Sequence, residues 1–423
     1  MNDMKKIFAL LIVSSLFAAC HHDDAEEEPQ TPERTVLIYV AGENNLSSFA
    51  NKDLEEMKTA SKSLNNKHRL IVYVDQASST PPFFARIKDG QFVDSVSVEE
   101  SLTSDPAILE KALNYMRTTY PAKSYGLVLW GHASGWLISN DSVAYAQSRA
   151  YGGDTGKNYS SSAGNFWMNI PSMARAIAKG MNGTPLSFVF GDCCCFGCVE
   201  IAYELRQVAD YVIGSPAEIP DSGAPYDLVV PDLFNTNAEF YKAIIDDYYN
   251  YYQKEYKDNP YRYYNLTHGD LEGYSVPLMA VKTSELEALA TATAQLLGTI
   301  EDSLTPEGNF DLTDKLCYAQ YSSYRYSYDM YNILKGNTSA ADFNNWTAAY
   351  WKAVPYHLNS IQWLTAYTQL STYFKSIEIQ EADCGVLSMY IPRPEYRNTS
   401  PVWNTTIQQF QWNNVIRWQQ YGW

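Results

Sequence analysis

The sequence predicts an α/β fold in which helices cover both faces of a mostly parallel central sheet, followed by C-terminal elaborations. Continuous apolar runs recur along the chain, as in TVLIYV (35–40) and RLIVYV (69–74), and such runs are typical of strands buried on both faces. Segments with helical spacing separate the runs, which is the order of a parallel sheet with crossover helices. Polar and glycine-rich residues follow two of the later runs directly, at the edge where sites form in such sheets.

Each predicted element of the first half follows from a local pattern. Apolar residues at helical spacing follow the first run from Leu46 to Met57, and a Lys-Asp-Gly-Gln turn joins strands 83–87 and 92–96 into a hairpin. Pro106 begins a helix over 107–120. The remaining elements of this half are strands at 125–130, 186–190 and 211–214 and helices at 170–180 and 199–208.

The second half is less regular. It contains predicted helices at 241–256 and 286–304, a strand at 274–281 that Pro277 favours as an edge strand, and a late strand at 384–392. The sequence shows no internal repeat and no clean linker. We therefore expect an α/β domain at 34–283 with a C-terminal helical and mixed extension at 284–423 that packs directly on it.

The N-terminus has the pattern of an export signal. Two lysines precede the apolar run 7–19, which is too short to span a bilayer. Cys20 follows two alanines and resembles the lipobox of bacterial lipoproteins, in which this cysteine is lipidated; cleavage near Ala19 without lipid is the alternative. We therefore expect a lipoprotein signal peptide at 1–19 and an acidic tether at 20–33. The tether resembles export signals of surface lipoproteins, which implies a lipid-anchored protein at the bacterial outer membrane or cell surface.

The charge balance excludes one class of partner. The net charge is −17 and the pI is near 4.8, whereas nucleic-acid binding needs clustered Lys and Arg. An acidic surface suits cationic peptides or simple solubility. The 34 tyrosines are expected mainly in packing, with sugar binding as the less favoured alternative.

Four of the seven cysteines lie within GDCCCFGC (191–198). A metal site, a disulfide, packing and a nucleophile are all conceivable. Neighbouring side chains on an extended strand point to opposite faces, so three consecutive cysteines suit tetrahedral zinc poorly, and no metal site is expected. The two remaining mature cysteines, Cys317 and Cys384, are either paired or buried thiols.

A nucleophile is the interpretation that the surrounding residues favour. The cluster and His132 each follow a predicted strand, and the cluster directly precedes a helix whose N-terminus favours a thiolate. His132 offers an imidazole that titrates near neutral pH. Backbone N–H groups after His132 and at the cysteine provide candidates for an oxyanion hole.

Two blocks resemble the clostripain family of cysteine peptidases, which shares its fold with caspases, gingipains and legumain. They are LVLWGHASGW (127–136) and GDCCCFGCVEIAYEL (191–205), and weaker similarity extends from TVLIYVAGENNL (35–46) to the C-terminal end. The resemblance implies a caspase-like α/β/α sandwich with 34–283 as the catalytic domain. It implies a Cys-His dyad of Cys194 and His132, with an oxyanion hole from the N–H groups of Ala133 and Cys194. The other cysteines of the cluster fall on small or apolar positions.

The resemblance also implies an endopeptidase that cleaves after Arg or Lys. A buried cationic side chain needs a paired carboxylate, and the candidates are Asp192, Glu218 and Asp221. The alternatives are a loop-fixing role for Asp192 and solvated loop charges for the other two. Family members also cut themselves between the two blocks, which here implies Lys157 or Arg149.

Some residues depart from the family pattern. Ala133 replaces the usual glycine after the histidine, and Pro216 breaks the pattern after Ser215. The alternative function is therefore a catalytically inactive surface lipoprotein of the same fold that binds peptide or glycan. We expect a monomer with no cofactor; some relatives use calcium, but no EF-hand-like loop is visible.

Overall fold

The computed structural model describes residues 31–138, 150–156, 166–258, 275–321, 324–360, 363, 381–399 and 402–423. Residues 31–423 form one compact unit. The predicted signal peptide, most of the tether, and Cys20, Arg149 and Lys157 lie outside the described residues. No described helix combines the length and the apolar composition that crossing a membrane would require.

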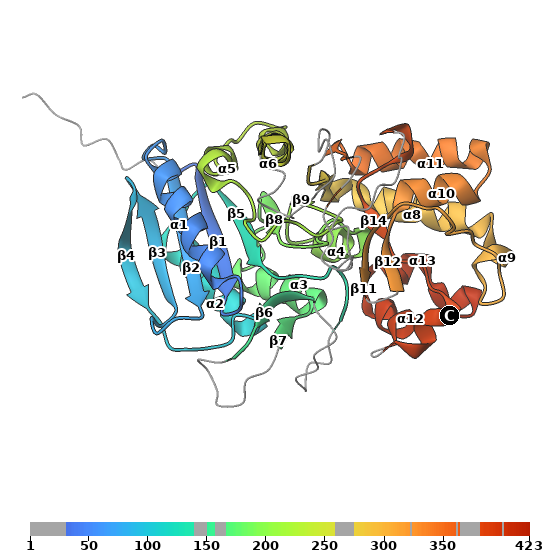
Figure 1. Ribbon diagram of the computed structural model, residues 1–423, viewed down its shortest axis with the longest axis horizontal. Helices are drawn as coiled ribbons and strands as arrows, with labels where there is room; N and C mark the ends of the chain where they lie inside the picture. Colours follow the sequence, from blue (N-terminus) through green and yellow to red (C-terminus); the bar gives the residue numbers. More distant parts are fainter. Residues whose placement is uncertain are drawn as a thin grey trace, which may run out of the picture. The chain divides into compact units, whose positions relative to one another are not determined.

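A nine-stranded sheet organises the first part of this unit, in the order β13-β10-β9-β8-β5-β1-β2-β3-β4 (Figure 1). Its five central strands are parallel, as predicted. They are β1 (Arg34–Gly42), β2 (His68–Gln76), β5 (Ser124–Gly131), β8 (Phe188–Asp192) and β9 (Tyr211–Gly214). The antiparallel additions are the predicted hairpin of β3 (Phe83–Lys88) and β4 (Gln91–Ser97) at one edge, and β10 (Leu278–Lys282) and β13 (Tyr356–Leu358) at the other.

The strand containing Pro277 was expected at an edge, and this expectation is wrong. β10 begins at Leu278 and pairs with β9 on one side and with β13 on the other. Pro277 therefore precedes the ladder, so its missing N–H costs the sheet no hydrogen bond. The short β13 forms the edge instead.

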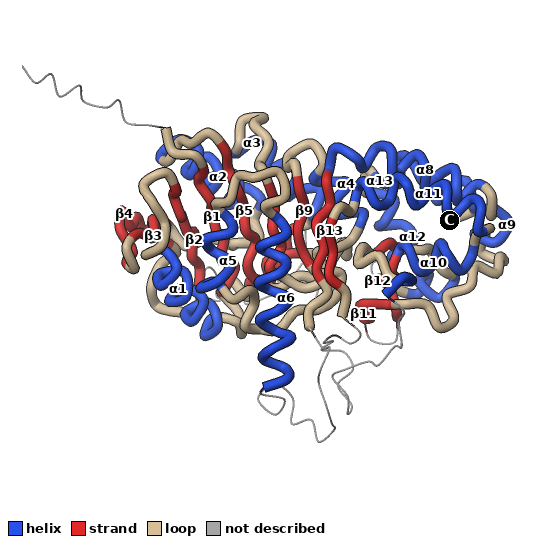
Figure 2. Tube along the Cα trace, turned by 90° about the horizontal axis from the view of Figure 1, so that it is seen from above, coloured by secondary structure: helices blue, strands red, loops and turns tan. Residues whose placement is uncertain are grey.

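Helices cover both faces of the sheet, which confirms the α/β prediction (Figure 2). One face packs against α1 (Ser47–Ser61), α5 (Tyr226–Leu233) and α6 (Tyr241–Asp258), and the other against α2 (Pro106–Thr119), α3 (Ile170–Gly180) and α4 (Val199–Leu205). Along β1, Val36 and Ile38 join the first core and Leu37 and Tyr39 the second. This alternation is the reason why a continuous apolar run was the signal for a strand.

The C-terminal part adds helices and a second, three-stranded sheet in the order β11-β12-β14. Its strands are β11 (Cys317–Tyr321), β12 (Tyr324–Asp329) and β14 (Ser388–Met389), and its helices are α8 (Leu286–Gly298), α9 (Glu301–Leu304), α10 (Met330–Asn337), α11 (Ala340–Ala353), α12 (Trp403–Thr406) and α13 (Trp412–Ile416). Short 3-10 turns lie at Thr283–Glu285, Glu381–Asp383, Pro394–Asn398, Ile407–Gln409 and Trp418–Tyr421. The single helix predicted over 286–304 is two helices, because the chain leaves helical geometry at Ile300 (φ −130°, ψ 26°).

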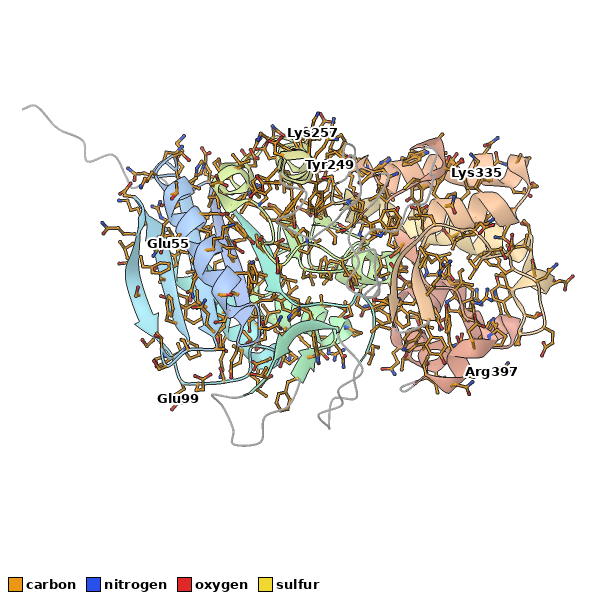
Figure 3. The ribbon with its side chains drawn as sticks, in the orientation of Figure 1. Glu55, Glu99, Tyr249, Lys257, Lys335 and Arg397 are labelled. Atoms are coloured by element: carbon orange, nitrogen blue, oxygen red, sulfur yellow. The ribbon has the colours of Figure 1, made fainter. Side chains whose placement is uncertain are left out.

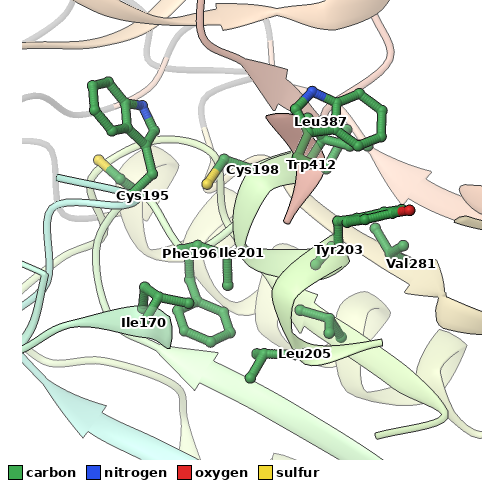
Figure 4. Packing of buried hydrophobic residues seen from close by; sticks show 14 of the residues in the cluster. Ile170, Cys195, Phe196, Cys198, Ile201, Tyr203, Leu205, Val281, Leu387 and Trp412 are labelled. Carbon is green, nitrogen blue, oxygen red and sulfur yellow. The ribbon is translucent and has the colours of Figure 1, made fainter. Parts of the chain in front are cut away.

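This C-terminal part packs directly on the cysteine segment. The Ser388 N–H donates to the Gly197 carbonyl at 3.0 Å, and the Tyr390 N–H donates to the buried Glu200 carboxylate at 2.8 Å. Leu387 and Trp412 lie beside α4 in the apolar cluster of Figure 4. Charged side chains such as Glu55, Lys335 and Arg397 are exposed (Figure 3).

All cysteines of the described residues are free thiols. Cys317 and Cys384 are both buried, and no disulfide joins them. The Cys384 Sγ lies 3.0 Å from the Tyr318 hydroxyl.

Candidate active site

The two candidate catalytic residues occupy equivalent positions at the carboxyl ends of neighbouring strands. β5 and β8 are adjacent and parallel, and their last paired residues are Trp130 and Asp192. His132 and Cys194 each lie two residues beyond that pair. Adjacent strands are about 4.8 Å apart, so the register brings both residues to one stretch of the sheet edge, as the sequence predicted.

The cysteine loop buries three of its thiols and leaves one partly accessible. Cys193, Cys195 and Cys198 belong to the apolar core, whereas Cys194 is half-buried. Figure 4 shows Cys195 and Cys198 in that packing. Cys195 has a left-handed backbone (φ 58°), which costs a non-glycine residue on the order of 1 kcal/mol or more. The structure therefore agrees with small packing roles for the three buried cysteines.

Backbone hydrogen bonds hold this loop in place. The Cys195 N–H donates to the Ala217 carbonyl at 2.8 Å, and the Gly197 N–H donates to the Ser215 carbonyl at 2.7 Å. At Gly191 a Cβ atom would lie 2.2 Å from the Phe196 ring, so only glycine allows the ring to fold back there. The segment after β9 is thus hydrogen-bonded to the loop that carries Cys194 and holds it in place.

The environment of Cys194 favours the neutral thiol. Its Sγ accepts a hydrogen bond from the Ile219 N–H at 3.4 Å. Burial, followed by the negative charge of Glu218, raises the pKa of Cys194 to about 12. The sequence suggested thiolate stabilisation by a helix N-terminus, but α4 begins only at Val199, beyond the first-turn range of that effect. A base is therefore needed to remove the proton.

Alkylation of Cys194 should show this high pKa. We expect the rate of reaction with iodoacetamide to rise about tenfold per pH unit between pH 7 and pH 9, because the thiolate fraction grows by that factor well below the pKa. Mass spectrometry of the modified peptide after timed quenching measures the rate, and the Cys194→Ala protein supplies the background. A rate that is already constant between pH 6 and pH 8 would contradict the neutral thiol.

His132 is oriented by a side chain from the turn after β1. Its Nε2 lies 2.9 Å from Asn45 Oδ1, and its ring centroid lies 6.4 Å from that of Trp167. With the amide oxygen as acceptor, Nε2 carries the proton, which makes Nδ1 the basic nitrogen of the neutral ring. Asn44 fixes the turn by donating from Nδ2 to the Gly153 carbonyl at 2.6 Å. In the sequence, this Asn-Asn-Leu turn carried only family similarity, and no pattern indicated a role for Asn45.

A short strand, β6 (Tyr151–Asp154), lies beside the residue that follows the histidine. β6 pairs with β7 (Phe166–Met168). The Gly152 N–H donates to the His132 carbonyl at 2.8 Å, and the Ser134 N–H donates to the Ala150 carbonyl at 3.1 Å. Within the described ranges, neither the Ala133 N–H nor the Cys194 N–H donates to a backbone carbonyl. An oxyanion hole formed by these two groups stays a prediction from the resemblance.

The histidine and cysteine loops also contact each other. A Cβ atom at Gly135 would lie 3.0 Å from the Cys195 carbonyl oxygen, and Gly135 has a φ of 73°. The Tyr326 hydroxyl donates to the Ser134 carbonyl at 3.4 Å and lies 3.7 Å from the Cys195 Sγ. A side chain of the C-terminal part therefore links the two loops, a contribution that no local sequence pattern indicated.

The three candidate pocket acids have different surroundings. Asp192 is 2% exposed and accepts hydrogen bonds from the Ala224 N–H at 3.0 Å, the Tyr226 hydroxyl at 2.7 Å and the Tyr248 hydroxyl at 3.2 Å. Burial raises its pKa to about 6. These bonds fit the loop-fixing alternative. Glu218 is half-buried and interacts electrostatically with Cys194, whereas Asp221 is exposed.

Asp53 is a further buried acid that sequence reasoning missed. It lies on the packed side of α1, is 1% exposed, and its Oδ2 accepts a hydrogen bond from the Trp130 indole N–H at 2.7 Å. Burial, and then the charge of Asp192, raise its pKa to about 8. Its position between the apolar residues Ala50, Leu54 and Met57 was the available signal.

The fold and this edge of the sheet define a class, the cysteine-type peptidases with a caspase-like fold. The sequence profile of the Clostripain family (Peptidase_C11) matches residues 38–423. The chain therefore belongs to the clostripain family of cysteine peptidases. No curated protein matches it.

Solved structures of C11 proteases are similar over nearly the whole chain. A secreted C11 cysteine protease from Bacteroides thetaiotaomicron, in complex with an irreversible peptide inhibitor, is 30% identical with a TM-score of 0.75, and the match covers 92% of this chain and 99% of that one. An inactive zymogen C11 protease from Parabacteroides distasonis is 25% identical with a TM-score of 0.70, at 92% and 99% coverage. A second secreted protease from B. thetaiotaomicron, "iotapain", is 17% identical with a TM-score of 0.68, at 92% and 100% coverage, and shows the fold alone.

Proposed function

We propose that the chain is an endopeptidase in which Cys194 is the nucleophile and His132 the general acid and base. The supporting observation is the equivalent placement of the two residues beyond the Trp130–Asp192 pair of adjacent parallel strands. Because Nε2 donates to Asn45, Nδ1 is the basic nitrogen of His132, and it takes the thiol proton in this proposal. Since the pKa of Cys194 is raised to about 12, proton transfer to the imidazole accompanies attack on the scissile carbonyl.

The remaining steps use groups already described. Attack by Sγ forms a tetrahedral oxyanion, to which the N–H groups of Ala133 and Cys194 donate. The imidazolium of His132 then protonates the leaving amine as the C–N bond breaks. Water, deprotonated by the same imidazole, hydrolyses the thioester and releases the second product. This chemistry requires no cofactor.

We further propose that substrates carry Arg or Lys before the cleaved bond. Glu218 supports this specificity, because its carboxylate lies close enough to Cys194 to raise the thiol pKa and is only half-buried. A cationic side chain beside it would gain a charge-assisted hydrogen bond. Asp192 accepts hydrogen bonds that join β8 to α5 and α6. Its carboxylate adds a negative charge two residues before the nucleophile in the chain.

Glu218→Gln tests this specificity through two effects of opposite sign. We expect kcat/KM for fluorogenic peptides with Arg or Lys at the cleavage site to fall by about tenfold or more, the value of one charge-assisted contact. Alkylation of Cys194 at pH 8 should become faster, because removal of the Glu218 charge lowers the thiol pKa. Glu307→Gln, at an exposed position in the C-terminal part, is the matched control and should change neither.

The same peptide panel tests the enzyme proposal as a whole. Turnover of basic peptides by the wild-type protein, with little turnover of neutral ones, is the expected result. Equal turnover of neutral peptides would contradict the specificity alone. Absence of turnover on every peptide, in both single-chain and cleaved protein, would favour the inactive peptide- or glycan-binding lipoprotein.

Self-cleavage after Lys157 or Arg149 remains our proposal for maturation. Both residues lie outside the described part of the chain, but they flank β6, whose Gly152 N–H holds the His132 carbonyl. A cut on either side of β6 would therefore change what constrains His132. The similar P. distasonis protein was solved as an inactive zymogen, which supports a maturation step.

We also propose lipidation of Cys20, attachment at the outer membrane or cell surface, and a monomeric state.

A further inference from the structure

The imidazole of His132 has an aromatic neighbour that the proposed mechanism does not use. Trp167 lies in β7, and its ring centroid is 6.4 Å from that of His132, with an angle of 50° between the two ring planes. The indole is partly exposed, although tryptophan is on average one of the more buried side chains. This position makes the indole a candidate to contact the molecule on which His132 acts.

The strand pattern of β7 directs Trp167 away from the apolar core. Side chains alternate between the two faces of a strand. Met168 belongs to the core and is 1% exposed, and Phe166, on the same face, packs against Gly156. Trp167 therefore points to the opposite face of the hairpin, and its ring meets the imidazole there.

A β-bulge in the small sheet of β6 and β7 (Figure 1) shapes the place that the indole occupies. The paired positions leave one residue of β7, Trp167, opposite two residues of β6, Gly152 and Gly153. Gly152 has a φ of 69°, and a Cβ atom at Gly153 would lie 2.5 Å from the Trp167 ring. Bulges change the direction of a side chain and are common beside active sites. The two glycines thus let the indole lie directly on the β6 backbone.

Hydrogen bonds join the same strand to the histidine loop and to the turn after β1. The Gly152 N–H donates to the His132 carbonyl at 2.8 Å. Asn44 Nδ2 donates to the Gly153 carbonyl at 2.6 Å. The indole and the imidazole are therefore carried by one hydrogen-bonded unit, and backbone contacts set the distance between them.

The chemistry of the proposed reaction brings one part of the substrate to this point. His132 protonates the leaving nitrogen, so this nitrogen must come within about 3 Å of the imidazole. The Cβ atom of the residue after the cleaved bond is two covalent bonds further on, about 2.5 Å from the nitrogen. The side chain of that residue therefore begins within contact range of a ring whose centroid lies 6.4 Å from that of the imidazole.

We propose that Trp167 is a specificity-determining residue, which binds a large apolar side chain on the residue directly after the cleaved bond. This inference rests on the proposed function, because it uses His132 as the group that protonates the leaving amine. An indole gains free energy by burying an aliphatic or aromatic side chain, and it gains none from glycine. The substrate class then has two requirements: a basic residue before the bond, and a leucine, methionine or aromatic residue after it.

Peptide binding to the Cys194→Ala protein tests the inference without turnover. Peptides with an N-terminal fluorescein carry Arg before the bond and Gly, Leu or Phe after it, and fluorescence anisotropy gives each Kd. We expect the Leu and Phe peptides to bind about tenfold more tightly than the Gly peptide, the value of one side chain packed on an indole. A second pair of peptides, which differ only in the residue before Arg, reports on the other side of the bond.

Variants of Trp167 in the same background locate the contact. Trp167→Ala should reduce the tenfold ratio of Kd values to less than about threefold, and Trp167→Phe, which keeps an aromatic ring, should restore part of it. The ratio of two Kd values from one preparation does not depend on the fraction of folded protein, so partial misfolding cannot imitate this loss. Trp351→Ala is the matched control: Trp351 lies on α11, is 38% exposed, and should leave the ratio at its parent value.

The outcomes separate this inference from the proposed function. Equal affinity for the Gly and Phe peptides, or a ratio that Trp167→Ala leaves unchanged, would overturn the inference alone. An effect of Trp167→Ala on only the pair that differs before Arg would also overturn it, since the indole would then lie on the acyl side of the bond. The expected ratio without turnover of any peptide by the wild type would support the Trp167 contact and contradict the proposed catalysis. No binding of any peptide at millimolar concentration would overturn both.

Discussion

Cys194→Ala is expected to abolish peptide hydrolysis, with kcat falling by a factor of about 10⁴ or more, as for other removed nucleophiles. Cys193→Ala and Cys195→Ala should retain most activity, because their thiols are buried in the core. Each should instead lose roughly 1 kcal/mol of unfolding free energy, the value of a small cavity. Initial rates on a basic fluorogenic peptide and urea unfolding curves measure the two effects.

The same set of variants tests maturation and register. The Cys194→Ala protein should stay a single chain on a denaturing gel, whereas wild type is cut after Lys157 or Arg149. Cutting of both proteins there would rule out self-processing. If Cys193→Ala were the inactive variant and Cys194→Ala the active one, the nucleophile would be one residue earlier than proposed.

His132→Ala is expected to lower kcat by about 10²- to 10⁴-fold, the range of a lost general acid and base. Asn45→Ala should lower it by about tenfold only, because the imidazole remains but loses the 2.9 Å contact that orients it. The pH dependence of kcat/KM separates the roles: Asn45→Ala should shift the acidic limb, and His132→Ala should remove it. His68→Ala, at the far end of β2, is the matched control.

Two results would contradict this assignment. An Asn45→Ala protein with an unchanged pH profile and rate would show that Asn45 does not act through the histidine. A His132→Ala protein that retains full activity would require another base at the sheet edge.

The sequence predicted the parallel core and the site edge well because both follow from local signals. Buried strands such as 35–40 need apolar residues on both faces, and a residue just past a parallel strand can only lie at the carboxyl edge. The two sequence blocks around His132 and Cys194 then identified the family. Two details of the prediction were wrong. Pro277 precedes its strand, which is not an edge strand, and the helix predicted over 286–304 breaks near Ile300.

By itself, the sequence determined the fold class, the family, and which of the clustered cysteines is the candidate nucleophile. Only the tertiary structure decided the surroundings of those residues: the Asn45 contact of His132, the Tyr326 link between the loops, the hydrogen-bonded Asp192, and the indole of Trp167 beside the imidazole. The physical reason is sequence distance. Apolar periodicity reports which face of one element is buried, whereas a hydrogen bond or a pKa depends on side chains tens to hundreds of residues away, which meet only when the sheet order is set.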